Sequence, residues 1–292
     1  MGIVETKAEN YRAGVIEEEN TGIDVGILTK GKPTLGMVLT SLLLQEAVTV
    51  RIHVVDTSSR PVINRDDVRF ALRLAGDRGI LCNYDFAGES DRAFSAGRAR
   101  LIRALRGEHL CLMDDDVVMP SAALKNLIAT AQRSGVYGYI SPLCKNSPGT
   151  DSSVGNRPQY SPGSLIYQDP LVREILVEYY ETSIDVLDRR KSDHKVWENA
   201  FLTALFDALD RPCIRQQDIV TYHLDYQEDP YWIEEERTVV ARSRQTARSL
   251  VEGTHDHLNY SLHPTSTSDD FHVRSSSKSW VRRARRALRL ER

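Results

Sequence analysis

The stretch HLCLMDDDV, residues 109–117, decides the fold. Its first five residues form a mostly apolar run, and three consecutive aspartates follow. A short apolar run that ends abruptly in charged residues is typical of a buried strand whose carboxyl end opens into a loop. Just before it, residues 93–106 predict a helix that leads through Gly107 into the strand. A helix that feeds directly into a buried strand indicates an α/β protein with a parallel sheet.

The same alternation of strands and helices extends along the chain in both directions. Before the decisive stretch, the pattern predicts strands at 24–28, 50–55 and 80–83 and helices at 33–45 and 65–76. After it, the pattern predicts strands at 137–141 and 214–221, helices at 169–190 and 197–209, and a long Ser, Gly and Pro-rich loop at 146–163. We therefore expect a mostly parallel sheet with helices on both faces.

The composition is that of a folded protein. The chain has 292 residues, of which 41% are hydrophobic and 27% charged, which is enough for one large domain or two small ones. No apolar run approaches the roughly 20 residues that cross a bilayer, and the acidic first residues do not resemble a secretory signal. We therefore expect a cytoplasmic protein, with its four widely spaced cysteines reduced.

Charge is unevenly distributed along the chain. The net charge is −3, and residues 273–292 contain eight Lys or Arg and one Glu, so this end carries +7 and the rest −10. An acidic body argues against a nucleic-acid partner. We predict an acidic arm at 1–20, a main domain at 21–230 and an extension at 231–292. The extension ends in a predicted basic amphipathic helix, which suits peripheral contact with an anionic membrane or self-association. A solvated or disordered end is the alternative.

Polar residues end three of the predicted strands: Thr29, Asp56 and the aspartate triplet. In parallel sheets, ligands bind at the carboxyl ends of the strands, so we expect these residues in one site. Asp114 and Asp116 are two positions apart in an extended segment and can point the same way, offering hard oxygen ligands to a divalent cation. A solvated acidic turn is the alternative for the triplet, and a turn cap is the alternative for Asp56.

Two further residues fit this site by their position. His223 ends another apolar strand, and a neutral imidazole is a good third ligand beside carboxylates, particularly for manganese. Arg98, on the helix before the aspartates, suits neutralisation of a phosphate, although a solvated helix face explains it equally well. No G-x-G-x-x-G follows any predicted strand and no G-x-S-x-G is present, which argues against a dinucleotide dehydrogenase and against a serine hydrolase.

Taken in order, several segments resemble the glycosyltransferases of the GT-A fold, most closely those of family 2. They are DVGILTKGKP at 24–33, SLLLQ at 41–45, VVDTSS at 54–59, SAGRARLIRALRGEHLCLMDDDV at 95–117, Trp197-Glu198-Asn199, and His223. The resemblance covers about residues 23–225. It implies a Rossmann-like GT-A fold with a mixed, mostly parallel sheet, in which 21–230 is the catalytic domain. Trp-Glu-Asn followed by a histidine also resembles the polypeptide GalNAc-transferases.

This resemblance implies metal-dependent transfer of a sugar from a UDP- or GDP-linked donor to an acceptor hydroxyl. The implied donor-binding residues are Thr29, Asp56, Arg98, Asp114 and Asp115. The implied ligands of Mn²⁺ or Mg²⁺ are Asp114, Asp116 and His223. The implied catalytic residues are Glu198 and Asn199.

The acceptor side departs from the family pattern. Inverting members usually carry Glu-Asp where this chain has Glu198-Asn199, and that aspartate deprotonates the acceptor. An asparagine cannot do so, which leaves open an inverting reaction with Glu198 as the base or a retaining reaction that needs no protein carboxylate. The opening loop after Thr29 also departs from the family's Pro-x-Tyr-Asn. Two other functions stay open: a sugar nucleotidyltransferase, whose glycine-rich opening loop is missing here, and a nucleotide-sugar-binding protein without turnover.

Overall fold

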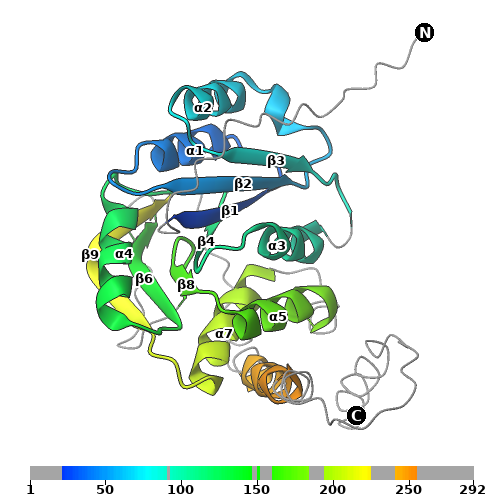
Figure 1. The fold of residues 1–292 in the computed structure, drawn as a ribbon. Coiled ribbons are helices and arrows are strands. Elements are labelled where there is room, and N and C mark those ends of the chain that lie inside the picture. The colour runs from blue at the N-terminus through cyan, green and yellow to red at the C-terminus, as the bar shows by residue number, and fades with distance from the viewer. Residues whose placement is uncertain are drawn as a thin grey trace, which may run out of the picture.

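The computed structural model of the protein describes residues 22–90, 93–146, 150–151, 160–183, 194–224 and 241–254. The predicted arm at 1–20 and the predicted basic helix at the end of the chain lie outside these residues. Within them, the strands form one mixed sheet with helices on both of its faces (Figure 1). The expected α/β class is confirmed.

The sheet contains nine strands: β1 (Ile23–Thr29), β2 (Val50–Asp56), β3 (Cys82–Phe86), β4 (His109–Asp114), β5 (Val117–Val118), β6 (Tyr139–Asn146), β7 (Thr150–Asp151), β8 (Leu165–Tyr167) and β9 (Ile214–His223). The helices are α1 (Leu35–Leu43), α2 (Asp66–Asp77), α3 (Ala93–Ala104), α4 (Ala123–Ser134), α5 (Pro170–Glu178) and α7 (His194–Ala208). A 3₁₀ turn, η1 (Val62–Asn64), precedes α2, a π-helical turn, η2 (Tyr179–Ser183), continues α5, and a further helix spans 241–254.

The strand order is β3-β2-β1-β4-β8-β6-β9-β5, with β7 paired to β6. The first four strands of this order are parallel, so their carboxyl ends lie at one edge of the sheet. β8 then pairs antiparallel with both β4 and β6, and β9 runs parallel to β6 and antiparallel to β5. This change of direction brings the end of β9 back to the edge where β4 ends.

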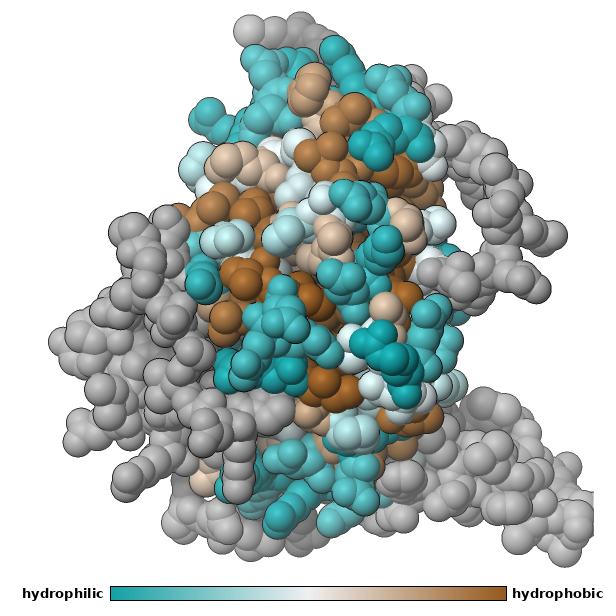
Figure 2. All heavy atoms as spheres, turned by 90° about the vertical axis from the view of Figure 1, so that its left-hand side faces the viewer, coloured by the Kyte–Doolittle hydropathy of each residue, from teal (hydrophilic) through white to brown (hydrophobic). Residues whose placement is uncertain are grey.

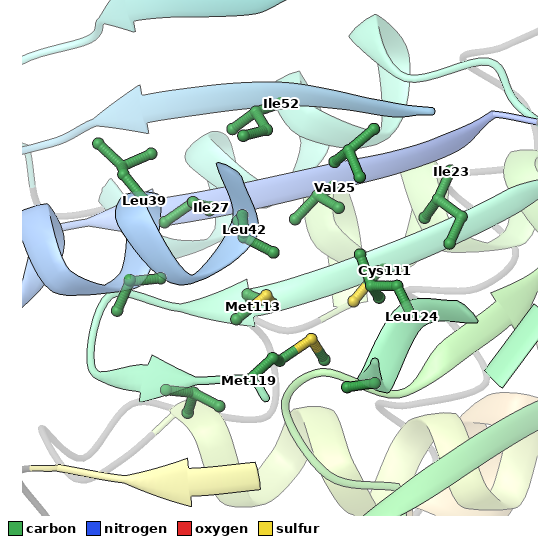
Figure 3. Close-up of a cluster of buried hydrophobic side chains, with 14 of the residues drawn as sticks. Ile23, Val25, Ile27, Leu39, Leu42, Ile52, Cys111, Met113, Met119 and Leu124 are labelled. Carbon is green, nitrogen blue, oxygen red and sulfur yellow. The ribbon is translucent and has the colours of Figure 1, made fainter. Parts of the chain in front are cut away.

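The core has two parts, one on each face of the sheet. Along β1, Ile23, Val25 and Ile27 point into the part covered by α1, α2 and α4, which Figure 3 shows. Leu28 points into the other part, with residues of α3, α5, α7 and the helix 241–254. This alternation is the period of two that a strand buried on both faces requires.

Several described elements go beyond the sequence prediction, among them α4, β8 and the helix 241–254. The buried residues of α4 include Leu124, Leu127 and Ala131, whose spacing of three and four is the ordinary signal of an amphipathic helix. β8 has only three residues, which is too short for periodicity to detect. The helix 241–254 buries Ala247, Leu250 and Val251 in the same cluster as residues of α7.

The surface is mixed in hydropathy on one side of the molecule. On the side that carries α4 and β9 in Figure 1, hydrophilic residues are interspersed with hydrophobic ones (Figure 2). None of the helices in the described part of the chain is long and apolar enough to span a membrane.

All four cysteines are free thiols, and burial raises the pKa of Cys82 and of Cys111 to about 12, as expected for reduced structural residues.

Gly138 allows α7 to pack closely against the start of β6. A Cβ atom added at this position would lie 2.6 Å from both Cβ and Cγ of Phe206, and the Phe206 Cβ is fixed to the backbone of α7 and cannot rotate away. We expect Gly138→Ala to lower the free energy of unfolding by about 1–3 kcal/mol, measured by urea denaturation. Gly76→Ala is the matched control, because nothing lies within 4 Å of its added Cβ in α2. It should stabilise by up to about 1 kcal/mol, and equal effects of the two variants would contradict this account.

Candidate active site

The candidate site lies where β1, β2 and β4 end together. The strand register places Thr29 beside Asp56 and Leu28 beside Asp114, so the aspartate triplet follows directly at the same edge. β9 reaches this edge from the other half of the sheet, because its last residue, His223, pairs with Val117 of β5. A hydrogen bond of 2.8 Å from the backbone N of Leu224 to the backbone O of Asp116 closes the arrangement.

The three aspartates contact three different partners. An Asp114 oxygen accepts a hydrogen bond from Arg98 Nη2 at 3.1 Å. Asp115 turns to the loop after β1, and Asp116 turns to Lys32 and His223. All three side chains are buried, so the triplet is not the solvated acidic turn that was the alternative interpretation.

Asp115 is bound to the end of β1 across 86 positions of sequence. Its Oδ2 accepts hydrogen bonds from Thr29 Oγ1 at 2.6 Å and from the backbone N of Lys30 at 3.3 Å. Burial raises the pKa of the Asp115 carboxyl, and the charges of Asp116 and Asp114 raise it further, against the opposing effects of Thr29 and Lys32. The pair fixes the loop after β1 to the aspartate triplet.

Three residues are suited to hold a metal ion. One ligand atom from each of Asp114, Asp116 and His223 lies within 4.8 Å of the others, and His223 Nε2 is 3.1 Å from Asp116 Oδ1. Two carboxylates and an imidazole suit a divalent cation such as Mn²⁺. The structure thus brings together all three residues that the sequence analysis named as metal ligands, from strands that are distant along the chain.

A cation of the protein itself already occupies part of this position. Lys32, from the loop between β1 and α1, donates from Nζ to Asp116 Oδ2. The Asp116 side chain is fully buried, and that of Lys32 is 31% exposed. The chemistry of the site therefore fits a positive ion at Asp116. Lys32 belongs to the opening loop that departs from the family's Pro-x-Tyr-Asn pattern, and no role was predicted for it.

Arg98 and Glu198 form a buried ion pair behind the aspartates. Arg98 donates from Nε to Glu198 Oε1 at 2.9 Å and from Nη2 to Oε2 at 3.1 Å, which is a bidentate contact. Tyr180, at the start of η2, donates its hydroxyl to Glu198 Oε1. The exposed fractions are 1% for Arg98 and 3% for Glu198. In this arrangement Arg98 contacts both Glu198 and Asp114 and so links the two carboxylates.

The charges of this network are fixed by its own contacts. Burial acts to lower the pKa of Arg98, but the Glu198 and Asp114 carboxylates outweigh it and raise the pKa above its ordinary value. Burial, together with the Glu198 charge, raises the pKa of Tyr180 well above its usual range, so the phenol stays a hydrogen-bond donor. Arg98 is therefore permanently charged.

Asp56 and Asn199, the other two predicted site residues, differ in their surroundings. The Asp56 carboxylate is buried and accepts hydrogen bonds from the backbone N of Ser58 at 2.9 Å, the backbone N of Val62 at 2.8 Å and the Tyr84 hydroxyl. It therefore caps its own turn, and its predicted contact with a base or ribose stays a prediction. Asn199 is half-buried on α7, and its backbone O accepts from Thr203 Oγ1 at 2.9 Å.

Comparison with solved structures identifies the fold. No protein-family model and no curated protein matches the chain. The S. aureus TarS 1–349 structure in complex with UDP has a TM-score of 0.53 and 13% sequence identity, covering 82% of this chain and 72% of that one. TarS 1–349 in complex with UDP-GlcNAc has a TM-score of 0.53 and 12% identity, covering 90% and 79%. At this identity the likeness establishes the fold, which is that of the GT-A glycosyltransferases.

Proposed function

We propose that this protein is a metal-dependent glycosyltransferase that moves a sugar from a nucleoside-diphosphate sugar to an acceptor hydroxyl. The observation that carries the proposal is the convergence of Asp114, Asp116 and His223, with ligand atoms within 4.8 Å, at the carboxyl edge of the sheet. The support from the fold is that TarS, which shares it, was solved with UDP and with UDP-GlcNAc. Ligands of such sheets bind at this edge.

Each side chain has a proposed task. Asp114, Asp116 and His223 would hold Mn²⁺ or Mg²⁺, which supplies Lewis-acid stabilisation of the departing nucleoside diphosphate. Thr29 and Asp115 fix the loop after β1, beside which the nucleoside would lie, and Asp56 shapes the neighbouring turn. Arg98 and Glu198 hold Asp114 in place from behind.

A retaining reaction accounts best for the acceptor side. Asn199 cannot accept a proton, and the Glu198 carboxylate is committed to Arg98 and Tyr180. In front-face attack, the acceptor oxygen bonds to the anomeric carbon as the bond to the leaving phosphate breaks, and the phosphate takes the proton. The same two observations favour a second candidate, a nucleotide-sugar-binding protein that does not catalyse transfer.

A binding screen tests the proposal. The melting temperature is measured with UDP, GDP, ADP, CDP and dTDP, each with and without Mn²⁺. We expect at least one nucleoside diphosphate to raise Tm by about 4 °C or more at a concentration of 100 Kd, and only when Mn²⁺ is present. No shift with any of them would contradict the proposal.

The sugar derivatives of the nucleotide that binds separate the candidate functions. Slow hydrolysis of the nucleotide sugar, or transfer to simple alcohols, supports the glycosyltransferase. Binding of the nucleotide sugar without either reaction supports the second candidate. Release of inorganic pyrophosphate from a nucleoside triphosphate and a sugar phosphate would instead identify a sugar nucleotidyltransferase.

A further inference from the structure

Lys32 brings a positive charge of the protein into the candidate metal site. Its Nζ donates to one oxygen of Asp116, and His223 lies at the other oxygen. The carboxylate is fully buried, whereas the lysine side chain is about one third exposed and arises from a loop. The ammonium group can therefore leave Asp116 for water without any opening of the core.

Resting on the function proposed above, we propose that Lys32 competes with the divalent cation for Asp116 and binds the donor diphosphate once the cation has displaced it. Lys32 thereby makes metal binding depend on the nucleotide.

Electrostatics requires the first half of this exchange. A divalent cation ligated by Asp116 would lie within about 4 Å of an ammonium bound to the same carboxylate, where two like charges repel strongly at an intermediate dielectric. Lys32 must then move away, and its attraction to Asp116 is lost. Metal binding to the ligand-free protein is weakened by that loss.

The chemistry of the lysine side chain leads to the second half. Its flexible four-carbon stem keeps the displaced ammonium within reach of whatever anion binds the cation. A diphosphate bound to the metal is such an anion, and a lysine ammonium is a common phosphate ligand. The nucleotide then restores the ion pair that the metal removed, so metal and nucleotide bind cooperatively.

Lys30 offers a matched control in the same loop. Its side chain is exposed, and only its backbone N contacts the aspartate triplet. Lys30→Met and Lys32→Met therefore remove the same charge from positions two residues apart, but only Lys32→Met removes the contact with Asp116.

The test measures binding, not activity. Mn²⁺ is titrated into wild type, Lys32→Met and Lys30→Met without nucleotide, and free Mn²⁺ is measured by electron paramagnetic resonance. We expect Lys32→Met to bind Mn²⁺ about tenfold more tightly than wild type. Inorganic pyrophosphate, a probe without a base, is then titrated at saturating Mn²⁺ by calorimetry, and we expect Lys32→Met to bind it about tenfold more weakly. Lys30→Met should stay within twofold of wild type in both titrations.

The outcomes separate this inference from the proposed function. If wild type binds Mn²⁺ but Lys32→Met binds it no more tightly, the competition is overturned while the proposed function stands. If pyrophosphate binds equally well to wild type and to Lys32→Met, the role of Lys32 at the diphosphate is overturned. If wild type and Asp116→Asn bind Mn²⁺ equally, the metal site itself is wrong, and the proposed function fails with it.

Discussion

Asp116→Asn is expected to abolish Mn²⁺ binding and to lower sugar transfer by about a thousandfold. Asp116 is the most enclosed of the proposed ligands, because its side chain is fully buried between Lys32 and His223. An asparagine keeps the shape and removes the charge that a divalent cation needs. Mn²⁺ binding by electron paramagnetic resonance and transfer rates at saturating nucleotide sugar measure the two effects.

Asp218→Asn provides the control for this prediction. Asp218 is an exposed carboxylate on β9, the strand that also supplies His223, and it has no place in the proposed site. The control should bind Mn²⁺ and transfer sugar as wild type does. Wild-type activity of Asp116→Asn in the presence of a chelator would contradict a metal-dependent mechanism through this residue.

Arg98→Met is expected to lower the free energy of unfolding by about 3–5 kcal/mol. The substitution leaves the carboxylates of Glu198 and Asp114 buried without the cation that neutralises them. Methionine fills much of the volume of the arginine stem, so the cost is mainly that of uncompensated charge. Urea denaturation followed by circular dichroism measures it.

Two further variants separate charge from volume in this network. Arg100→Met, on the same helix, breaks an exposed ion pair with Asp85 and should cost less than about 1 kcal/mol. The double variant Arg98→Met/Glu198→Leu removes both main charges and should be more stable than Arg98→Met alone. A double variant that is less stable than the single one would show that packing, and not buried charge, dominates at this position.

The sequence predicted the parallel half of the sheet because each of its strands carries a complete local signal. Residues 109–114 are mostly apolar, end in charge and follow a helix. β2 repeats that pattern, and β1 shares the apolar run that ends in a polar residue. The same reasoning predicted that Asp114, Asp116 and His223 lie together, because each was expected at or just after the carboxyl end of a strand. β8 escaped prediction, because three residues carry no period and its position depends on pairing with strands far along the chain.

Side-chain partners were harder to predict than positions. Arg98 and Glu198 were both assigned to the site, but their bidentate contact joins residues 100 positions apart, and no local pattern encodes it. Asp56 was expected to meet a ligand, and no local pattern indicated that its oxygens also accept hydrogen bonds from the turn that follows it. The partner of a buried polar group is set by what the fold leaves within reach, which single-residue chemistry does not reveal.

The hydrogen bond from Leu224 to the backbone of Asp116 also bears on how the protein matures. The proposed cation site includes the last residue of β9, so a ribosome-bound chain that has not yet emerged past this point would lack one of the three proposed ligands. Any affinity for the ion must then appear late, after the most distant strand pairing in the sheet has formed. Metal uptake would thus report on completed folding.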